Sequence, residues 1–254
     1  MGGAIARAVC AVIDPQDVLL SNRTRAKAET LASELGCRCG SNEEVASSCD
    51  YIFLAVKPQM MDTLLKSIAP ILSERKDRFV LVSIAAGLKI EKILSTLGAE
   101  YPIIRIMPNT PAAIGMGMIQ YCTKGISDAE EQEFLQFMSG AGILDSLSEE
   151  LIDAASSVSG CGPAWAFQFI EALADGGVAC GLPRAKAQLY AAQMLAGSAQ
   201  LLLKSGKHPG QLKDAVCSPG GTTIQGVRKL EEEGFRGAVM DAVIAAYEKT
   251  LELG

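Results

Sequence analysis

Histidine is almost absent from this chain of 254 residues, because His208 is its only one. A single histidine excludes metal centres built from several histidines, and it leaves any Ser-His or Cys-His catalysis dependent on that one residue. His208 precedes Pro209 in a polar stretch, so we expect a solvated loop histidine. The chemistry of the protein must therefore rest on other groups, and we expect no metal site.

An excess of positive charge is also missing. Lys and Arg total 23 against 29 Asp and Glu, a net charge of −6, so no basic field attracts nucleic-acid phosphate. Membrane spans need about 18–20 uninterrupted apolar residues. The nearest candidate, 163–181, is interrupted by Gln168, Glu171 and Asp175, and the start lacks a basic region followed by an apolar signal. We expect neither nucleic acid nor a membrane as a partner.

Paired cysteine motifs are lacking as well. The eight cysteines form no C-x-x-C pair, and most have apolar neighbours, where Cys behaves as a small hydrophobic residue. This pattern favours a reduced, cytoplasmic location. The composition, 49% hydrophobic and 20% charged, is ample for a core and typical of a globular protein.

The first part of the chain alternates strands with helices. The almost wholly apolar runs at 51–56 and 79–84 are typical of strands covered on both faces. Helices end at Gly36 and Gly98, and Ser127 with Glu130 forms a capping box that opens another. Such alternation predicts a mainly parallel sheet with crossover helices. The expected strands are Asp17–Ser21, Tyr51–Val56, Phe79–Ala86, Ile103–Met107, Met116–Cys122 and Gly142–Leu147, and the expected helices are Arg25–Leu35, Ile90–Leu97 and 127–141.

After Ser148 the strand pattern disappears and Ala/Leu/Gln-rich segments predict only helices. The helices at 164–180 and 184–204 carry more apolar surface than a layer of this size can bury alone, so we expect a second chain to cover it. We therefore divide the chain into an α/β domain at 1–147 and an all-helical domain at 148–254. The expected helices are 148–158, 164–180, 184–204, 209–216, 222–233 and 235–252.

Two N-terminal segments are candidates for binding a dinucleotide. Met1, Gly2 and Gly3 look like the end of a G-x-G-x-x-G turn, after which a helix N-terminus would hold a pyrophosphate. At the end of the next strand, Asn22, Arg23 and Thr24 offer donors to the 2′-phosphate of NADP, where an acidic residue would suit NAD. A frayed, glycine-rich terminus and a solvated arginine are the alternative interpretations.

Small residues follow two further strands, at 55–58 and 83–87, and ligands of open parallel sheets gather at such strand ends. After a third strand, the loop at 107–111 is stiffened by two prolines and presents the Asn109 amide and the Thr110 hydroxyl. In the helical half, Ser159–Trp165 and Ser218–Thr223 each lead into a helix and have the open-amide character of an anion site. Rigid turns and ordinary N-capping remain the alternatives.

Taken together and in order, these motifs resemble those of the pyrroline-5-carboxylate reductases, across essentially the whole chain. The resemblance rests on Met-Gly-Gly-Ala at 1–4, Ser-Asn-Arg-Thr at 21–24, Ala-Val-Lys-Pro at 55–58, Arg-Ile-Met-Pro-Asn-Thr-Pro at 105–111, Ser-Gly-Cys-Gly-Pro-Ala-Trp at 159–165, His-Pro-Gly-Gln-Leu-Lys-Asp at 208–214 and Ser-Pro-Gly-Gly-Thr-Thr-Ile at 218–224.

The resemblance implies an N-terminal Rossmann-like, doubly wound domain and a C-terminal domain that intertwines with its mate in a dimer, within larger rings such as decamers in some members. It implies reduction of 1-pyrroline-5-carboxylate to proline with NADPH, or alternatively NADH. Carried over residue by residue, the cofactor would contact Met1, Gly2, Asn22, Arg23, Thr24, Ala55, Val56, Lys57, Pro58, Ala85, Ala86 and Asn109. The substrate would contact Ser218, Gly220, Gly221, Thr222 and Thr223, with the Thr223 hydroxyl as the catalytic group near the ring nitrogen.

The chain departs from the family pattern in two places. Met1 aligns inside the dinucleotide turn, so the family's first strand and the first two glycines of the motif are missing, which would leave two neighbouring strands unpaired. Cys161 stands where the family usually has Ser. Two alternatives stay open: a reductase of another cyclic imino acid, and an inactive or regulatory oligomeric relative. A β-hydroxyacid dehydrogenase is disfavoured. That class normally carries a catalytic Lys on its first long inter-domain helix, and 148–182 contains no Lys.

Overall fold

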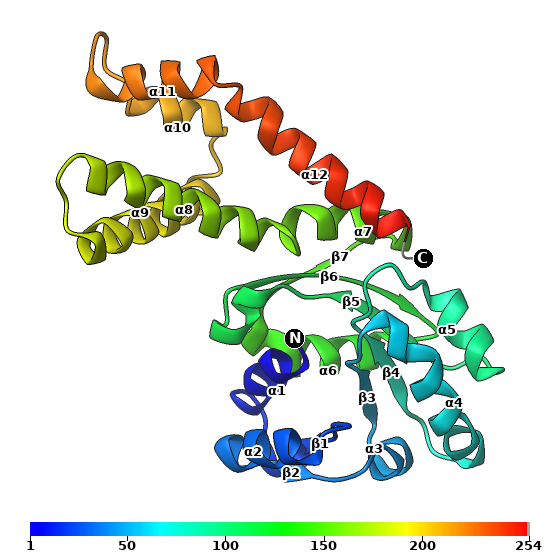
Figure 1. Cartoon of the computed structure of the whole chain (residues 1–254). Coiled ribbons are helices and arrows are strands. Elements are labelled where there is room, and N and C mark those ends of the chain that lie inside the picture. The colour runs from blue at the N-terminus through cyan, green and yellow to red at the C-terminus, as the bar shows by residue number, and fades with distance from the viewer. Residues whose placement is uncertain (253–254) are drawn as a thin grey trace. The chain divides into compact units, whose positions relative to one another are not determined.

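The computed structural model describes residues 1–252, which form two compact units (Figure 1). The first unit comprises residues 1–161 together with the chain from 246 onward, and the second comprises 162–245. Strands lie only in the first unit, and the described part of the second is entirely helical. The chain thus combines an α/β unit with an α-helical one, as its sequence pattern predicts.

A five-stranded sheet forms the centre of the first unit. Its order is β3-β4-β5-β6-β7, with every neighbouring pair parallel except the antiparallel β5 and β6. All residues of β4 and β5 are buried, as continuous apolar runs in a doubly covered sheet require. The strands are β3 Tyr51–Leu54, β4 Val80–Ser83, β5 Ile103–Met107, β6 Gly117–Lys124 and β7 Gly142–Ser146.

Helices cover both faces of this sheet (Figure 1). One buried cluster joins the sheet to α3 Asn42–Ser48, α4 Pro58–Glu74, α5 Ile90–Leu97 and α7 Glu149–Ser159. The other joins it to α1 Gly2–Cys10 and α6 Asp128–Met138, with the short turns η2 Thr110–Ile114 and η3 Ser139–Ala141. The arrangement is the doubly wound, Rossmann-like fold that the family resemblance implies.

A second, separate sheet contains only β1 Leu19–Leu20 and β2 Arg38–Cys39, which pair in parallel. The expected strand Asp17–Ser21 was therefore too long, because Pro15–Asp17 forms a 3-10 turn that delays it. Within residues 1–252, β1 pairs only with β2 and β3 only with β4. Each of β1 and β3 is thus paired with a neighbouring strand on one side.

Arg105 is a guanidinium buried in the middle of β5, with an exposed fraction of 0%. Its Nη2 donates to Asp153 Oδ1 at 2.6 Å, and its Nη1 lies 3.3 Å from Glu149 Oε1. Glu149 Oε1 also accepts from the Ile90 amide, the first of α5, at 2.7 Å. One buried ion cluster thus joins β5, α5 and α7, and it holds α7 on the first unit.

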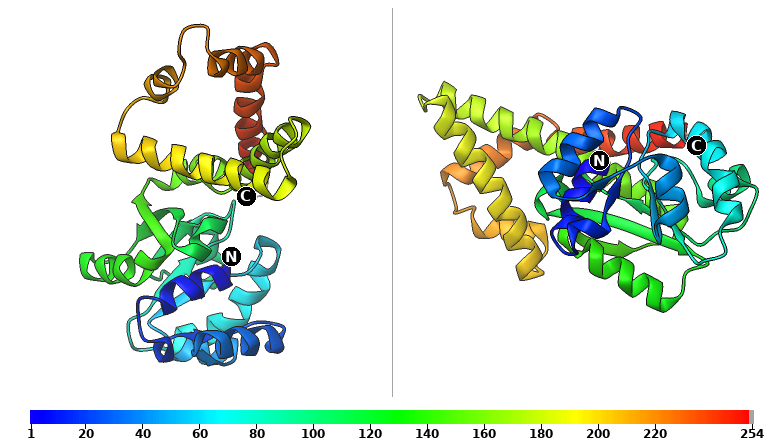
Figure 2. Two further views of the ribbon diagram at one scale, coloured as in Figure 1. Left: turned by 90° about the vertical axis from the view of Figure 1, so that its left-hand side faces the viewer. Right: turned by 90° about the horizontal axis from the view of Figure 1, so that it is seen from below.

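The second unit begins with a helical hairpin, visible in Figures 1 and 2, in which Gly177 of α8 faces Ala187 of α9. His208 lies at the N-cap of α10, where its Nδ1 accepts from the Gly210 amide at 3.1 Å. The single histidine is therefore exposed, as expected, and also has a capping role that the sequence had not indicated. The helices are α8 Gly162–Ala179, α9 Arg184–Ser205, α10 Pro209–Ala215, α11 Thr222–Glu232 and α12 Phe235–Leu251.

Helix ends agree closely with their sequence signals. Helix α2, Arg25–Leu35, ends at Gly36, and α5 ends at Gly98. Both glycines adopt the left-handed backbone conformation that is common at helix C-termini. The capping box of Ser127 and Glu130 opens α6. The expected helix 127–141 ends as an α-helix at Met138, and its last three residues form the 3-10 turn η3. Among the described helices, the longest apolar stretches fall short of what a bilayer crossing demands.

We expect Asp153→Ala to destabilise the first unit strongly, by about 3–5 kcal/mol, because it leaves the buried Arg105 charge without its shortest partner. Urea unfolding followed by circular dichroism measures the loss. The control is Glu100→Ala, which removes an exposed ion pair with Lys124 and should cost less than about 1 kcal/mol. Equal losses in the two variants would contradict a central role for the Arg105 cluster.

Candidate functional site

Three of the predicted cofactor segments follow three neighbouring parallel strands. Ala55 follows β3, Ala85 follows β4 and Asn109 follows β5. Since β3, β4 and β5 run parallel, their carboxyl ends meet at one edge of the sheet. The topology therefore brings these segments together where open α/β sheets bind nucleotides.

The N-terminus of α1 lies at the same edge. A Cβ on Gly2 would be 3.1 Å from the Cβ of Ala55, so glycine permits the close contact between the helix start and the end of β3. Met1 is the N-cap, and its carbonyl accepts from the Ala4 amide at 2.8 Å, whereas the amides of Gly2 and Gly3 precede any intrahelical acceptor. An open helix N-terminus beside a small residue leaves room for a pyrophosphate to approach the backbone amides.

The side chains around this edge differ in exposure. Ala55 and Lys57 are exposed, whereas Val56 and Pro58 are half-buried where α4 begins. Ala85 is only 1% exposed and its amide lies 3.4 Å from Ser83 Oγ, while Ala86 is half-buried. A ligand at this edge could reach Ala55 and Ala86 more easily than Ala85.

The 21–24 segment is an exposed turn between β1 and α2. Asn22 Oδ1 accepts from the Thr24 amide at 2.8 Å, which shapes the turn. Ser21 Oγ donates to Asn42 Oδ1 at 2.8 Å and anchors its start. Arg23 is exposed at the tip, where a guanidinium can bind a phosphate in solvent.

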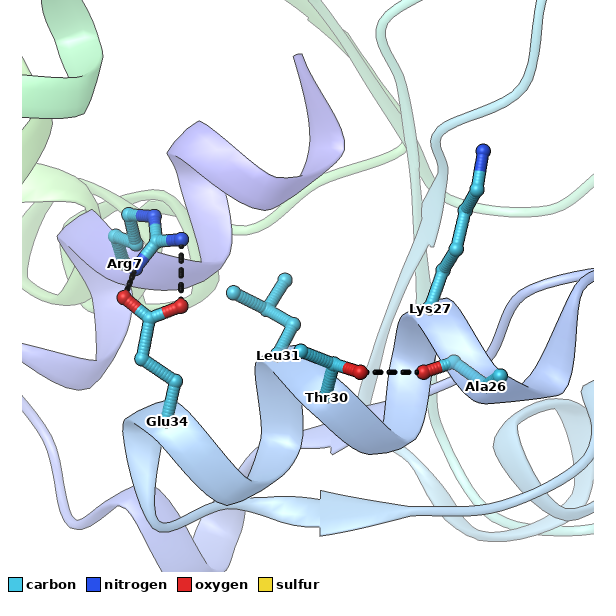
Figure 3. A pocket seen from close by; sticks show the side chains of 6 residues that line it. All are labelled: Arg7, Ala26, Lys27, Thr30, Leu31 and Glu34. Carbon is cyan, nitrogen blue, oxygen red and sulfur yellow. Dashed lines mark hydrogen bonds and ion pairs between the residues drawn. The ribbon is translucent and has the colours of Figure 1, made fainter.

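Helices α1 and α2 lie side by side and run in the same direction. Gly3 faces Leu31, and one turn later Arg7 forms a bidentate ion pair with Glu34, which lowers the pKa of that carboxyl through a hydrogen bond. Parallel packing directs the first turn of α1 and the 21–24 turn toward the same end. Figure 3 shows the cavity between the helices, lined by Arg7, Ala26, Lys27, Thr30, Leu31 and Glu34.

Asn109 is buried, and both the oxygen and the nitrogen of its side-chain amide are hydrogen-bonded within the protein. Its Oδ1 accepts from the Met118 amide at 3.1 Å, and its Nδ2 donates to the Ser159 carbonyl at 3.0 Å. Ser159 Oγ in turn donates to Gln120 Oε1 at 3.0 Å. The sequence suggested that Asn109 presents its amide to a ligand, but in this structure the amide connects the loop after β5 to β6 and α7. Gln120 and Ser159 were missed as polar partners, because contacts between distant segments leave no local pattern.

The predicted substrate residues belong to the second unit, at the start of α11. Gly221 is the N-cap, and its amide donates to the Ser218 carbonyl at 3.0 Å, so that amide is held within its own turn. Gly220 has a φ of 70°, a left-handed conformation that favours glycine. Thr222 and Thr223 occupy the exposed first turn of the helix, where backbone amides and hydroxyls can meet a carboxylate.

Comparison with known proteins places these features in a family. Residues 149–253 match the family described as pyrroline-5-carboxylate reductase dimerisation, and 1–87 match NADP oxidoreductase coenzyme F420-dependent. Pyrroline-5-carboxylate reductase of Escherichia coli is 45% identical over 84% of this chain and 78% of that protein. The reductase of Synechocystis is 39% identical over 100% of this chain and 96% of that protein.

A solved structure is similar over the entire chain. Plasmodium falciparum pyrroline carboxylate reductase with NADP bound is 36% identical, with a TM-score of 0.89, covering 100% of this chain and 94% of that one. The helical half matches the dimerisation family, in agreement with the many exposed apolar side chains on α8, α9 and α12. Identity and coverage of this extent show that the chain belongs to the pyrroline-5-carboxylate reductase family.

Proposed function

We propose that this chain reduces 1-pyrroline-5-carboxylate to L-proline with NADPH, the last step of proline biosynthesis. The observation that carries the proposal is the identity of 39% to a pyrroline-5-carboxylate reductase over the whole chain. The close approach of Gly2 to Ala55 at the carboxyl edge of the sheet adds physical support. A binding site for a dinucleotide at this edge agrees with both.

The cofactor end of the site is built from the first unit. The first turn of α1 would hold the pyrophosphate by backbone amides and the helix dipole. Arg23, with Asn22 and Thr24, would bind the adenosine 2′-phosphate, which favours NADPH over NADH. The remaining contacts would come from Met1, Ala55, Val56, Lys57, Pro58, Ala85, Ala86 and the loop of Asn109.

The substrate end would be built from the second unit. Amides of the α11 start, with Ser218 and Gly220 shaping the loop, would hold the substrate carboxylate. The Thr223 hydroxyl would position the ring nitrogen, and solvent would supply the proton that this nitrogen needs. NADPH, when bound, supplies the hydride that adds to the imine carbon. A protonated cyclic imine accepts hydride readily, so the protein chiefly orients the reactants and excludes water.

Residues 1–147 would serve as the NAD(P)-binding domain and 148–254 as the dimerisation and substrate domain. We further propose an intertwined homodimer that can assemble into larger rings such as a decamer, in which the substrate loop comes from the partner chain. Exposed apolar residues in the second unit support association, for example Phe167, Leu189, Leu203 and Met240. Eight free cysteines support a reducing, cytoplasmic compartment.

The proposed reaction predicts that NADPH absorbance at 340 nm falls when 1-pyrroline-5-carboxylate is added to this chain, with proline formed in equal amount. A reaction without the imine serves as the control. Folded protein that binds NADPH yet forms no proline would contradict the proposal and favour an inactive relative. Faster turnover of a different cyclic imino acid would favour a reductase of that substrate instead.

We expect Arg23→Ala to raise the KM for NADPH by roughly tenfold or more while changing the KM for NADH less than about twofold, because only NADPH has the 2′-phosphate. Steady-state kinetics with both cofactors measure the difference. Arg25→Ala is the matched control, since Arg25 lies two positions after Arg23 and is paired with Glu29. An equal rise for the two cofactors would argue against a phosphate contact of Arg23.

Thr223→Val, which keeps the shape but removes the hydroxyl, should lower kcat by roughly tenfold, the value of one hydrogen bond made to the reacting ring. Thr223→Ser retains the hydroxyl and should stay within about threefold of the unmodified enzyme. Rate measurements at saturating substrate distinguish the two variants. A Thr223→Val variant that keeps the kcat of the unmodified enzyme would show that the hydroxyl takes no part in the reaction.

A further inference from the structure

Gln120 is a buried amide at the edge of the sheet where the proposed cofactor segments meet. In the antiparallel pair of β5 and β6 it lies opposite Met107, the last residue of β5. Its side chain is 4% exposed, and its Oε1 accepts from the hydroxyl of Ser159, the last residue of α7, at 3.0 Å. Gln120 therefore joins β6 to the end of α7 at the carboxyl edge of β5.

The contact of Gln120 with Ser159 completes a ring of hydrogen bonds around the loop after β5. Asn109 Oδ1 accepts from the Met118 amide at 3.1 Å, and Asn109 Nδ2 donates to the Ser159 carbonyl at 3.0 Å. The hydroxyl of the same serine returns to β6 at Gln120, two residues after Met118. Each link of this ring limits the movement of Asn109, so loss of the Gln120 link would loosen the loop.

The packing of α7 does not depend on this ring. The Arg105–Asp153 ion pair and the fully buried Ile152 already attach the helix to the sheet. Ser159 Oγ also lies 3.1 Å from the Ala155 carbonyl, so its proton has a second acceptor within the helix. A buried amide with few partners stabilises a fold no better than an apolar side chain of its size. What Gln120 adds is the position of the last turn of α7, and with it the position of Asn109.

We propose that Gln120 is a positioning residue for hydride transfer, acting through Ser159 on the loop of Asn109. The inference rests on the proposed function. With the adenosine phosphate at 21–24 and the pyrophosphate at the start of α1, the nicotinamide end of NADPH would reach the strand ends of β4 and β5. A small displacement of a reacting ring lowers the rate far more than it weakens binding, because binding comes mostly from distant groups. Gln120 would thus govern turnover rather than affinity for the cofactor.

Gln120→Met tests this role, since methionine keeps the length and the burial of the side chain and removes the acceptor for Ser159. We expect kcat for imine reduction to fall roughly tenfold while the KM for NADPH stays within about twofold. NADPH deuterated at the transferred position should show a larger isotope effect on kcat in the variant, because hydride transfer becomes slower. The thermal midpoint should fall by less than about 4 °C.

Variants of α7 test the same contact from the helix side. Ser159→Ala should lower kcat as much as Gln120→Met does, and Ser159→Thr, which keeps the hydroxyl, should restore it. The double variant Gln120→Met/Ser159→Ala should also lose only about tenfold, because both changes remove one interaction, whereas independent effects would multiply to roughly a hundredfold. Ser157→Ala is the matched control, since the buried Ser157 hydroxyl donates to the Asp153 carbonyl within the helix at 2.9 Å.

NADPH binding without the imine separates this proposal from the proposed function. The fluorescence of bound NADPH reports how firmly its nicotinamide ring is held. Gln120→Met should bind NADPH with a Kd within about twofold of that of the unmodified protein but with weaker fluorescence from the bound cofactor. If the unmodified protein binds NADPH and reduces no imine, the proposed function fails, and this comparison still tests Gln120.

Two results would overturn the positioning role. One is a Gln120→Met variant that keeps both its kcat and the fluorescence of bound NADPH. The other is a loss in the double variant equal to the product of the two single losses, which would mean that Gln120 does not act through Ser159. If Gln120→Met does not fold, Ser159→Ala compared with Ser159→Thr decides the question, and equal activity in those two variants would also contradict the proposal.

Discussion

The buried guanidinium of Arg105 is the constraint on which the first unit depends. A charge with 0% exposure in the central strand must be compensated, and Asp153 and Glu149 do this from α7. Glu149 also binds the first amide of α5, so the same carboxylate positions a third element. Just after β5, Asn109 Nδ2 donates to the Ser159 carbonyl at the end of α7. The β5 segment and the helix are thus joined at two places, and the loop between β5 and β6 is held in place.

That rigidity matters because the candidate site has few charged groups. Its cofactor edge consists of small residues and helix amides, and the only histidine of the chain lies outside it, at the exposed N-cap of α10. Such a site works by orientation: Gly2 lets α1 approach Ala55, and parallel packing turns the starts of α1 and α2 toward one end. Hydride transfer to a protonated imine demands little more than this, since the carbon is already electrophilic.

Local sequence signals predicted most element boundaries. Helix stops at Gly36 and Gly98 need only a residue that adopts positive φ, and the Ser127 capping box is a short-range pattern. The β1 strand was predicted too long because Pro15–Asp17 forms a turn, and the two-residue β2 was not predicted at all. Strands this short have too few residues to show a period, and only pairing with each other defines them.

The sequence by itself determined the fold class, the family and the residue types at the candidate site, because motifs such as Ser21–Thr24 and Ser218–Ile224 are contiguous in the chain. Tertiary structure alone decided what those residues contact. It directed the Asn109 amide inward to Met118 and Ser159, and it used the Gly221 amide within its own turn. Hydrogen bonds and burial depend on distances between segments that are remote in the chain, and no local pattern encodes those distances.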